Sequence, residues 1–266
     1  INVTVGSDSS KVFDMIKGFV GKYNEIVDKI NASVSEKRYK DYLPLTDEQR
    51  AGMKDEDIKL WEQKAKSGIL RNESALKSIA DNFRKALYDP IYADSNDIST
   101  KLSYSLNSIG ISTGAYQDQG KLIIDEAKLK DAISKTPDKV IQLFTANSSV
   151  TYSDAMDDSA ASARRYKENG LANRLYDILQ DNIRTLRNSA GKKGVLLEKA
   201  GFEGDLSNTK NTLTYEIDAK DDLISSFYDR MLTRESALYA KFSTMESALA
   251  KMNSQSSWLS QQFGGG

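Results

Sequence analysis

The chain has 266 residues, with 37 basic side chains (Lys and Arg) against 38 acidic ones and a formal net charge of −1. This balance argues against nucleic-acid binding, which needs an excess of positive charge on one face. The absence of Cys and His excludes disulfides and thiolate sites and removes the commonest general base and metal ligand. No apolar run approaches the ~20 residues that a membrane-spanning helix needs, and only three Pro residues occur, which favours a mostly helical chain.

The amino-terminal residues alternate in polarity. Ile1, Val3 and Val5 are separated by polar side chains, which predicts a short strand followed by a turn at 6–8. Because no partner strand follows nearby, we expect residues 1–10 to be the last strand of a domain that lies upstream. Residues 11–34 then carry apolar side chains at alternating steps of four and three, which predicts a long helix. Its apolar face consists of Val12, Ile16, Phe19, Tyr23, Ile26 and Ile30.

Capping signals mark further helices between residues 46 and 87. Thr46 followed by Gln49 fits a capping box, and a helix at about 55–66 carries Trp61 on its apolar face. We expect Gly68 to end that helix in a left-handed conformation and Asn72 to cap the next one. The apolar face of this next helix consists of Leu76, Ile79, Phe83 and Leu87.

The stretch at 98–124 is rich in Ser, Thr, Tyr and Gly and predicts a small antiparallel hairpin. Its first strand is expected at 102–106 and its second at 121–124, with turns at Gly114 and Gly120. Asp125 marks the start of one helix, and the pair Thr136-Pro137 marks the start of the next, which contains Leu143 and Phe144. Residues 146–164 are expected to form a loop and residues 166–188 a helix.

The last sixty residues are predicted to form one long helix. No Pro or Gly occurs between Asp205 and Phe263. Apolar side chains follow alternating steps of three and four, taken through Lys220 and Arg234, and form a heptad-like face that we call the apolar seam. Its members are Leu213, Ile217, Ile224, Phe227, Met231, Leu238, Phe242, Met245, Leu249, Met252, Leu259 and Phe263. Two consecutive steps of four at Leu238 relax left-handed supercoiling there. We expect residues 213–231 of this helix to pack on the face of the 11–34 helix.

No residue cluster predicts a catalytic centre. Adjacent acids at 125–126 and 157–158 do not face each other on a helix and are better explained as caps and solvated side chains. The acids at 55–57 lack the Gly and the distal Glu of a calcium loop, and the sequence at 191–194 lacks the strand and the Ser or Thr of a phosphate-binding loop. A Ser–Lys dyad stays open, because no particular pair is singled out.

Several runs of residues, in a specific order, resemble the C-terminal half of the bacterial flagellar filament-capping family, hook-associated protein 2. The specific parts are LPLTDEQR at 43–50, IKLWEQKAKSGILRN at 58–72 and the ending KMNSQSSWL at 251–259. The run GKLIIDE at 120–126 is shared more loosely with other flagellar axial proteins. Further matching positions are Ile109, Gly110, Ile111, Leu129, Pro137, Val140, Leu143 and Phe144.

This resemblance implies export by the flagellar type III route and assembly into a ring-like homo-oligomer at the distal, extracellular tip of the filament. There the cap would guide flagellin subunits into place, with the terminal helix as part of a leg that contacts the filament end. The implied partners are a second copy of the chain, flagellin and the filament tip, with the hook–filament junction protein and an export chaperone as further ones. No nucleic acid, membrane insertion or cofactor is implied. The strand at 1–5 fits the tail of an outer β-rich domain.

The predicted fold is mainly α: a helical bundle with a small antiparallel β-hairpin and a long projecting C-terminal helix. We expect three parts: the last strand of an upstream domain at 1–10, the helical bundle with its hairpin at 11–232, and the filament-facing helix with a disordered Gly tail at 233–266. Expected interface residues are Leu238, Phe242, Met245, Leu249, Met252, Trp258, Leu259 and Phe263, and expected core residues are Phe19, Tyr23, Trp61, Phe83 and Phe144.

We expect a structural, assembly-promoting protein without an active site. One alternative is another axial or type III-secreted coiled-coil protein, such as a junction protein, flagellin or needle-tip component, against which the Trp61 run argues. The other alternative is a secreted hydrolase. Without His and Cys, the residue types leave a carboxylate-only mechanism, which would need a deep pocket with two acids about 5–10 Å apart.

Overall fold

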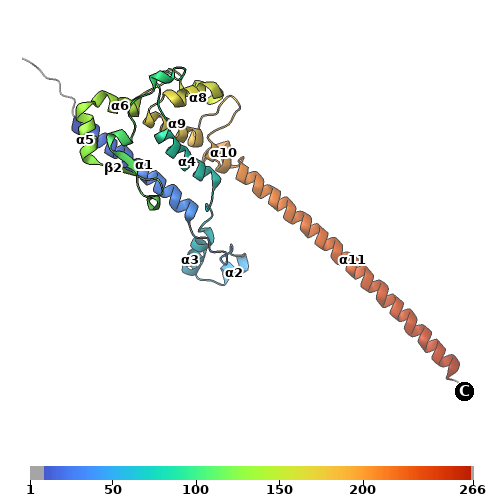
Figure 1. Cartoon of the computed structure of the whole chain (residues 1–266). Coiled ribbons are helices and arrows are strands. Elements are labelled where there is room, and N and C mark those ends of the chain that lie inside the picture. Colours follow the sequence, from blue (N-terminus) through green and yellow to red (C-terminus); the bar gives the residue numbers. More distant parts are fainter. Residues whose placement is uncertain (1–8, 265–266) are drawn as a thin grey trace, which may run out of the picture. The chain divides into compact units, whose positions relative to one another are not determined.

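The computed structural model describes residues 9–264, which form two compact units that divide between Glu198 and Lys199. The helices of the first unit are α1 (Ser9–Ser35), α2 (Asp47–Ala51), α3 (Asp55–Lys66), α4 (Ser74–Tyr88), α5 (Glu126–Lys135), α6 (Pro137–Thr145), α7 (Tyr152–Asp157), α8 (Ser159–Glu168) and α9 (Leu171–Ile183). Helix α10 (Val195–Ala200) crosses the division, and α11 (Thr212–Phe263) makes up most of the second unit (Figure 1). The predicted fold class, mainly helical with a small hairpin and a long C-terminal helix, is confirmed.

One face of α1 organises the core of the first unit. The buried side chains of this face recur at alternating steps of three and four, as on the inner side of an amphipathic helix. They are Phe13, Ile16, Val20, Tyr23, Val27 and Ile30. Helices α4 and α5 and strand β2 (Leu122–Ile124) pack on α1 (Figure 1), and the rings of Tyr23 and Phe83 lie 6.1 Å apart. Burying each such side chain contributes roughly 1.5–3 kcal/mol before chain entropy is subtracted.

The face of α1 that was expected to pack on the long C-terminal helix is occupied within its own unit. The inner face of α1 is already covered by α4, α5 and β2 within the first unit. Three side chains that the sequence pattern assigned to the inner face, Val12, Phe19 and Ile26, are only partly buried at its margin. In α11 the apolar side chains of residues 213–231 that belong to the seam are 40–60% exposed.

The hairpin is present, but its first strand is not where the sequence pattern placed it. Strand β1 (Ile111–Thr113) pairs antiparallel with β2 (Leu122–Ile124), in the register Ile111–Ile124, Ser112–Ile123 and Thr113–Leu122. The predicted second strand is confirmed, whereas the strand at 102–106 is wrong. The cause is a local turn, because the Ser108 hydroxyl accepts from the Ser105 amide at 2.9 Å and donates to the Ser105 carbonyl at 2.7 Å.

The segment from α2 to α3 is held by local contacts. The capping box is confirmed, since Thr46 Oγ1 accepts from the Gln49 amide at 3.3 Å and Gln49 Oε1 accepts from the Thr46 amide at 3.0 Å. Trp61 donates its indole N–H to the Leu43 carbonyl at 2.8 Å. Gly68 has φ +68, as expected for a helix end.

The expected cap at Asn72 is wrong. Its backbone is left-handed, with φ +61, and the side chain of Glu73 accepts from the Ala75 amide at the start of α4. Asn72 Oδ1 instead accepts a hydrogen bond from Lys77 at 2.8 Å.

Residues 146–164 form helices rather than the expected loop. Thr151 caps α7 by accepting from the Asp154 amide, and Asp158 caps α8 by accepting from the amides of residues 160 and 161. The helix expected at 166–188 is divided, since α8 ends at Glu168 and α9 begins at Leu171. Gly170 lies at this junction, where a Cβ atom would meet backbone atoms of residues 144 and 146 at 2.7 Å. The close approach of these backbones therefore requires Gly.

The predicted division of the chain into parts at 1–10, 11–232 and 233–266 stays a prediction. Residues 9–10 belong to α1 rather than to a strand, and the strand expected at 1–5 lies outside the described residues, as do the last two residues of the Gly tail. No break separates residues 232 and 233, because α11 runs without interruption from Thr212 to Phe263. The two compact units of the structure divide at 198/199.

Candidate functional site

Helix α11 is defined by signals at both of its ends. Asn211 Oδ1 accepts from the Thr214 amide at 2.9 Å, and the Asn211 side-chain amide donates to the Ser207 carbonyl at 2.9 Å, which fixes this N-cap. At the other end the Gly264 amide donates to the Ser260 carbonyl at 2.9 Å. The helix has 52 residues and is therefore about 78 Å long.

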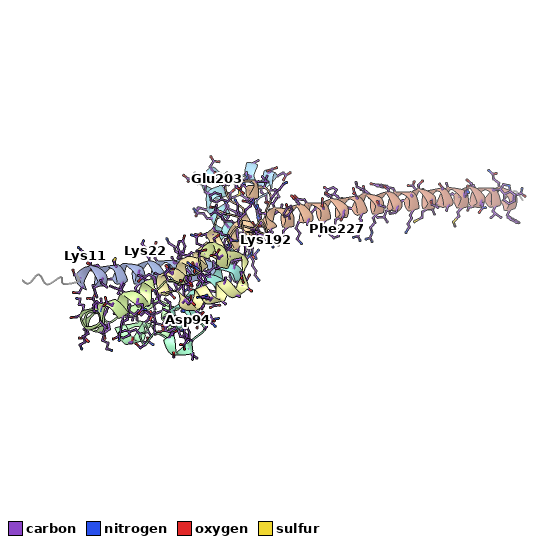
Figure 2. All side chains as sticks on the ribbon, turned by 90° about the horizontal axis from the view of Figure 1, so that it is seen from above. Lys11, Lys22, Asp94, Lys192, Glu203 and Phe227 are labelled. Atoms are coloured by element: carbon purple, nitrogen blue, oxygen red, sulfur yellow. The ribbon has the colours of Figure 1, made fainter. Side chains whose placement is uncertain are left out.

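The apolar seam of α11 is open to solvent. No residue of this helix is buried, and the seam side chains are 40–84% exposed. Figure 2 shows side chains standing out along the whole helix, Phe227 among them. The exposed fractions of the expected interface residues are Leu238 49%, Phe242 59%, Met245 57%, Leu249 57%, Met252 64%, Trp258 60%, Leu259 47% and Phe263 84%. A continuous apolar face of this length is typical of a surface that another chain covers.

Charge is distributed unevenly along α11. Residues 212–233 carry five acidic side chains, Glu216, Asp218, Asp221, Asp222 and Asp229, against Lys220 and Arg230. From residue 234 onward the helix has three basic and two acidic side chains, and residues 252–263 carry none. The last part of the seam, at residues 252–263, therefore lies in an uncharged, Ser- and Gln-rich stretch of helix. Docking of this part costs little desolvation of charge.

The first unit has a smaller apolar surface of its own. A groove of about 150 Å³ runs between α1 and α6 and is lined almost entirely by apolar side chains, including Val12, Met15 and Phe19. The ring of Phe19 meets that of Phe144 edge to face at 5.3 Å on its floor. Met15 is 69% exposed, so the groove is open on the α1 side.

The expected core residues fall into three positions. Tyr23, Phe83 and Phe144 lie in the buried cluster of the first unit, and Phe19 packs against the edge of that cluster. Trp61 lies outside it, in α3, where no side chain is buried. The indole is instead partly covered by the ring of Tyr42, whose centroid lies 4.7 Å away.

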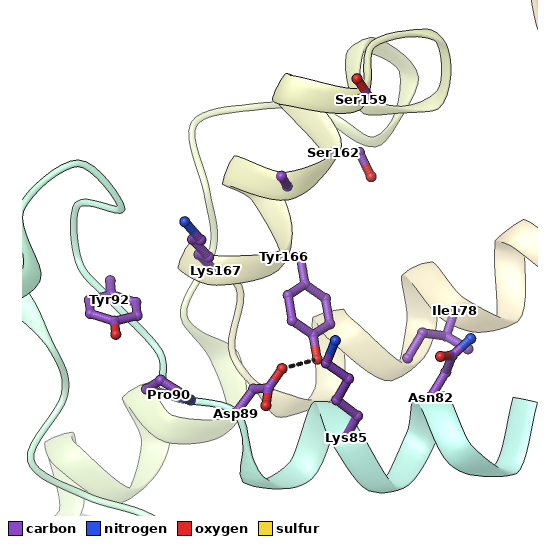
Figure 3. A pocket seen from close by; sticks show the side chains of 11 residues that line it. Asn82, Lys85, Asp89, Pro90, Tyr92, Ser159, Ser162, Tyr166, Lys167 and Ile178 are labelled. Atoms are coloured by element: carbon purple, nitrogen blue, oxygen red, sulfur yellow. Dashed lines mark hydrogen bonds between the residues drawn. The ribbon is translucent and has the colours of Figure 1, made fainter. Parts of the chain in front are cut away.

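A pocket of about 690 Å³ lies between α4 and α8 (Figure 3). Lys85 comes from α4 and Ser162, Tyr166 and Lys167 from α8, and Asp89 is the single carboxylate among the lining residues. Asp89 accepts a hydrogen bond from the Tyr166 hydroxyl at 3.0 Å. Burial and this hydrogen bond both raise the pKa of the Tyr166 phenol. The pocket thus lacks the pair of acids that a carboxylate-only hydrolase requires.

Arg174 is a buried side chain with several partners that the sequence pattern did not identify. It is 1% exposed, and its guanidinium donates to five carbonyl oxygens at the ends of α4 and α8. The acceptors are Ala86, Asp89, Pro90, Tyr166 and Lys167. The fork of donors on Arg satisfies several helix-terminal carbonyls at once, which are otherwise left without partners. Its role is to hold α4, α8 and α9 together.

A second polar cluster joins α8 to the preceding loop. Glu168, 5% exposed, accepts from the Ser148 and Ser95 hydroxyls and from Arg164 Nε. Burial alone would raise the pKa of the Glu168 carboxyl, but these hydrogen bonds outweigh it and lower the pKa to about 2. Arg165 binds both oxygens of Asp177 at 2.8 and 3.0 Å. Each of these groups has partners within the fold, so the cluster is structural.

The acids that the sequence offered as candidates are caps or surface groups. Asp125 caps α5 by accepting from the Lys128 amide, Asp158 caps α8, and Asp157 accepts from the Ser189 amide and hydroxyl. The acids at 55–57 lie in the first turn of α3. Among residues 9–264, no group of three or more Asp, Glu, His or Cys residues could hold a metal ion. Within the same residues, no helix is long and apolar enough to cross a membrane.

Comparison with known proteins gives a consistent result. A family model described as the C-terminus of flagellar hook-associated protein 2 matches residues 1–254. Proteins named flagellar hook-associated protein 2 from Halalkalibacterium halodurans and Thermotoga maritima are 33% and 28% identical to the chain, over 98% and 100% of its length. The chain spans 47% and 35% of these two relatives. A crystal structure of domains D1–D2–D3 of the flagellar cap protein FliD from Escherichia coli has a TM-score of 0.37 at 20% identity, covering 68% of this chain and 37% of that one.

Proposed function

The chain belongs to the family of flagellar hook-associated protein 2 C-termini, and from this premise we propose that it is part of the cap at the distal end of the bacterial flagellar filament. In this role it promotes the polymerisation of flagellin and works as one subunit of a ring-like homo-oligomer. The single observation that carries the proposal within the molecule is the exposed apolar seam of α11, which offers a 52-residue helix to another chain.

The mechanism is reversible docking of the distal part of α11 against the filament end. Covering Phe242, Met245, Leu249, Met252 and Leu259 contributes roughly 1.5–3 kcal/mol each, before the entropy of ordering is subtracted. An unpartnered helix is marginal in water because nucleation is costly, so we expect this part to fluctuate until it docks. Docking of this moderate strength allows the cap to release and bind again as each flagellin subunit is added.

The location and the other partners follow from the same proposal. The protein acts outside the cell at the filament tip and reaches it through the flagellar type III export route. Its partners there are further copies of itself, flagellin and the filament tip, with the hook–filament junction protein and an export chaperone met on the way. Family membership argues against an unrelated secreted coiled-coil protein.

Removal of residues 234–266 tests the proposal. The truncated protein is expressed in cells that lack their own copy, and the same truncation is purified to follow its unfolding. We expect the first unit to stay folded, because its core contains no α11 side chain. We also expect the cells to release unpolymerised flagellin instead of growing filaments. Filaments of normal length from the truncated protein would contradict the proposal.

A further inference from the structure

The pocket between α4 and α8 has a firmly held frame. Arg174 donates to the Asp89 carbonyl at 2.7 Å and to the Tyr166 carbonyl at 2.6 Å, which ties the end of α4 to α8. The Tyr92 amide donates to the Lys167 carbonyl at 3.0 Å and holds the loop after α4 against the end of α8. All of these contacts lie within the first unit. The pocket is therefore formed in advance, as sites for small ligands usually are.

Most of the surface inside the pocket is apolar. Pro90 and Ile178 line it, together with Ala163 and the ring of Tyr92 (Figure 3). Its volume of about 690 Å³ is typical of ligand pockets, which measure roughly 300–1,000 Å³. Apolar walls bind a group that gains by leaving water, so a ligand of this pocket should have an apolar body.

Two lysine ammonium groups at the pocket have no partner within the fold. Lys85 extends from α4 and Lys167 lies near the end of α8, and both residues are exposed. Among residues 9–264, neither ammonium group takes part in a hydrogen bond, an ion pair or a cation–π contact. Figure 3 shows Lys85 pointing from α4 toward α8. Both groups are therefore free to attract an anion that enters the pocket.

Positive charge outweighs negative charge around the pocket. Asp89 is the single carboxylate among the lining residues, and it accepts from the Tyr166 hydroxyl at 3.0 Å. The Tyr166 phenol adds no negative charge, because burial raises its pKa. Arg174 Cζ lies 4.6 Å from the centre of the Tyr166 ring, and within the described part of the chain this guanidinium forms no ion pair. A hollow in which one sign of charge prevails concentrates ions of the opposite sign.

We propose that this pocket binds a carboxylate carried on an apolar body, which is either a small organic acid or the C-terminal end of a peptide. The apolar body lies against Pro90 and Ile178, and the carboxylate is attracted by the ammonium groups of Lys85 and Lys167. Hydrogen bonds between two charged groups are about twice as strong as those between neutral groups. This binding does not depend on the proposed function and uses no residue of α11.

A phosphate group fits the pocket less well than a carboxylate. Phosphates are usually bound by free backbone amides at the start of a helix. At the start of α8 these amides are already occupied, because the Asp158 side chain accepts from the amides of residues 160 and 161. The guanidinium of Arg174 is also fully used by carbonyl oxygens.

Amide NMR spectra of the isotope-labelled 266-residue chain test the site, because they report on each backbone amide separately. The probe is phenylbutyrate, and phenylbutyramide is its neutral control of the same shape. We expect phenylbutyrate to shift the amides of residues 82–92 and 159–167 with a dissociation constant of about 1 mM or lower, and phenylbutyramide to bind at least about 10-fold more weakly. The same comparison between an acetylated dipeptide acid and its amide tests the peptide end, and the tighter of the two acids identifies the source.

Removal of both lysines tests their role. Lys85→Met with Lys167→Met should weaken the binding of phenylbutyrate at least about 10-fold, because the charge-assisted contacts are lost. Lys40→Met with Lys59→Met removes two exposed lysines outside the pocket, changes the net charge equally and should leave binding unchanged. Thermal unfolding followed by circular dichroism shows that both double variants remain folded.

Four outcomes would overturn the proposal. They are no shift of the pocket amides at about 10 mM phenylbutyrate, shifts confined to α11, equal binding of phenylbutyramide, and an unchanged dissociation constant in Lys85→Met with Lys167→Met. Binding of phenyl phosphate more tightly than phenylbutyrate would also count against a carboxylate ligand.

Discussion

Replacing Arg174 by Met is expected to destabilise the first unit strongly. The guanidinium donates to five carbonyl oxygens at distances from 2.6 to 3.3 Å, and its carbon Cζ lies 4.6 Å from the centre of the Tyr166 ring. Met fills a similar volume but donates no hydrogen bond, so these buried carbonyls would lose a partner. A buried carbonyl that loses its partner destabilises the fold by about 1–3 kcal/mol. Part of this loss is offset because the variant no longer buries a positive charge. The net loss should be about 3–5 kcal/mol.

Urea unfolding followed by near-ultraviolet circular dichroism measures this loss, because the signal comes from packed aromatic side chains such as Tyr23 and Tyr166. Arg174→Lys keeps the positive charge but not the planar fork of donors, so its loss should lie between those of Met and the native residue. Arg71→Met, at an exposed position, is the control and should change the free energy of unfolding by less than about 0.5 kcal/mol. A loss below about 1 kcal/mol in Arg174→Met would refute the reasoning, since the carbonyls would then be equally well satisfied without the guanidinium.

Three further predictions concern the first unit. Ile16→Ala should lower the free energy of unfolding by about 2–5 kcal/mol, both in the full chain and in a chain without residues 212–266, because Ile16 is 5% exposed and packs within its own unit. A loss that urea unfolding detects in the full chain but not in the shortened one would contradict this. Gly170→Ala should destabilise the first unit by about 1–3 kcal/mol because the new Cβ clashes with the backbone, whereas Gly21→Ala should stabilise α1 by about 0.5–1 kcal/mol because no atom lies within 4 Å of its new Cβ. Similar melting temperatures for the two variants would refute this difference. Because the pKa of Glu168 is lowered, its ionised carboxylate stabilises the fold at pH values above its ordinary pKa of 4.5, and this stabilisation of about 1–3 kcal/mol should be lost as the pH falls toward 2. The free energy of unfolding of Glu168→Gln should therefore depend less on pH, and a pH profile equal to that of the native chain would count against the role of this carboxylate.

Periodicity predicted the helices but not which side of α1 faces the core. Two interleaved faces share Ile16, Tyr23 and Ile30, and the sequence pattern fits both. One continues through Val12 and Phe19, and the other through Phe13 and Val20. Helices α4 and α5 and strand β2 pack on the second face and so decide which face is buried. The residue pattern of a single helix does not contain this information.

Short-range hydrogen bonds explain the errors in the loops. The Ser-rich run at 102–106 alternates like a strand, but the hydroxyl of Ser108 turns the backbone before pairing can start. The run at 146–164 looks like a loop by composition, yet Thr151 and Asp158 are good N-caps, and each of them starts a helix.

The buried polar groups were not predictable in the same way. Arg174 belongs to no recognisable motif, and three of its acceptors lie at the end of α4, which is distant in sequence. The only local signal is its position on α9, three residues after Leu171 and one before Leu175, which places a charged side chain on the buried face of an amphipathic helix. By contrast, the exposed face of α11 follows directly from the spacing of its apolar residues.

The most direct test of the proposed capping role is filament growth in cells whose only copy of the protein carries Phe242→Asp with Leu249→Asp. Both side chains are more than half exposed, so the two charges leave the fold intact but oppose burial of the seam. Ser236→Asp with Ser247→Asp adds the same charge on the opposite face of α11 and is the matched control. The account predicts leaked flagellin and missing filaments for the seam variant and normal filaments for the control. Normal filaments from the seam variant, with the protein present at its usual level, would contradict it.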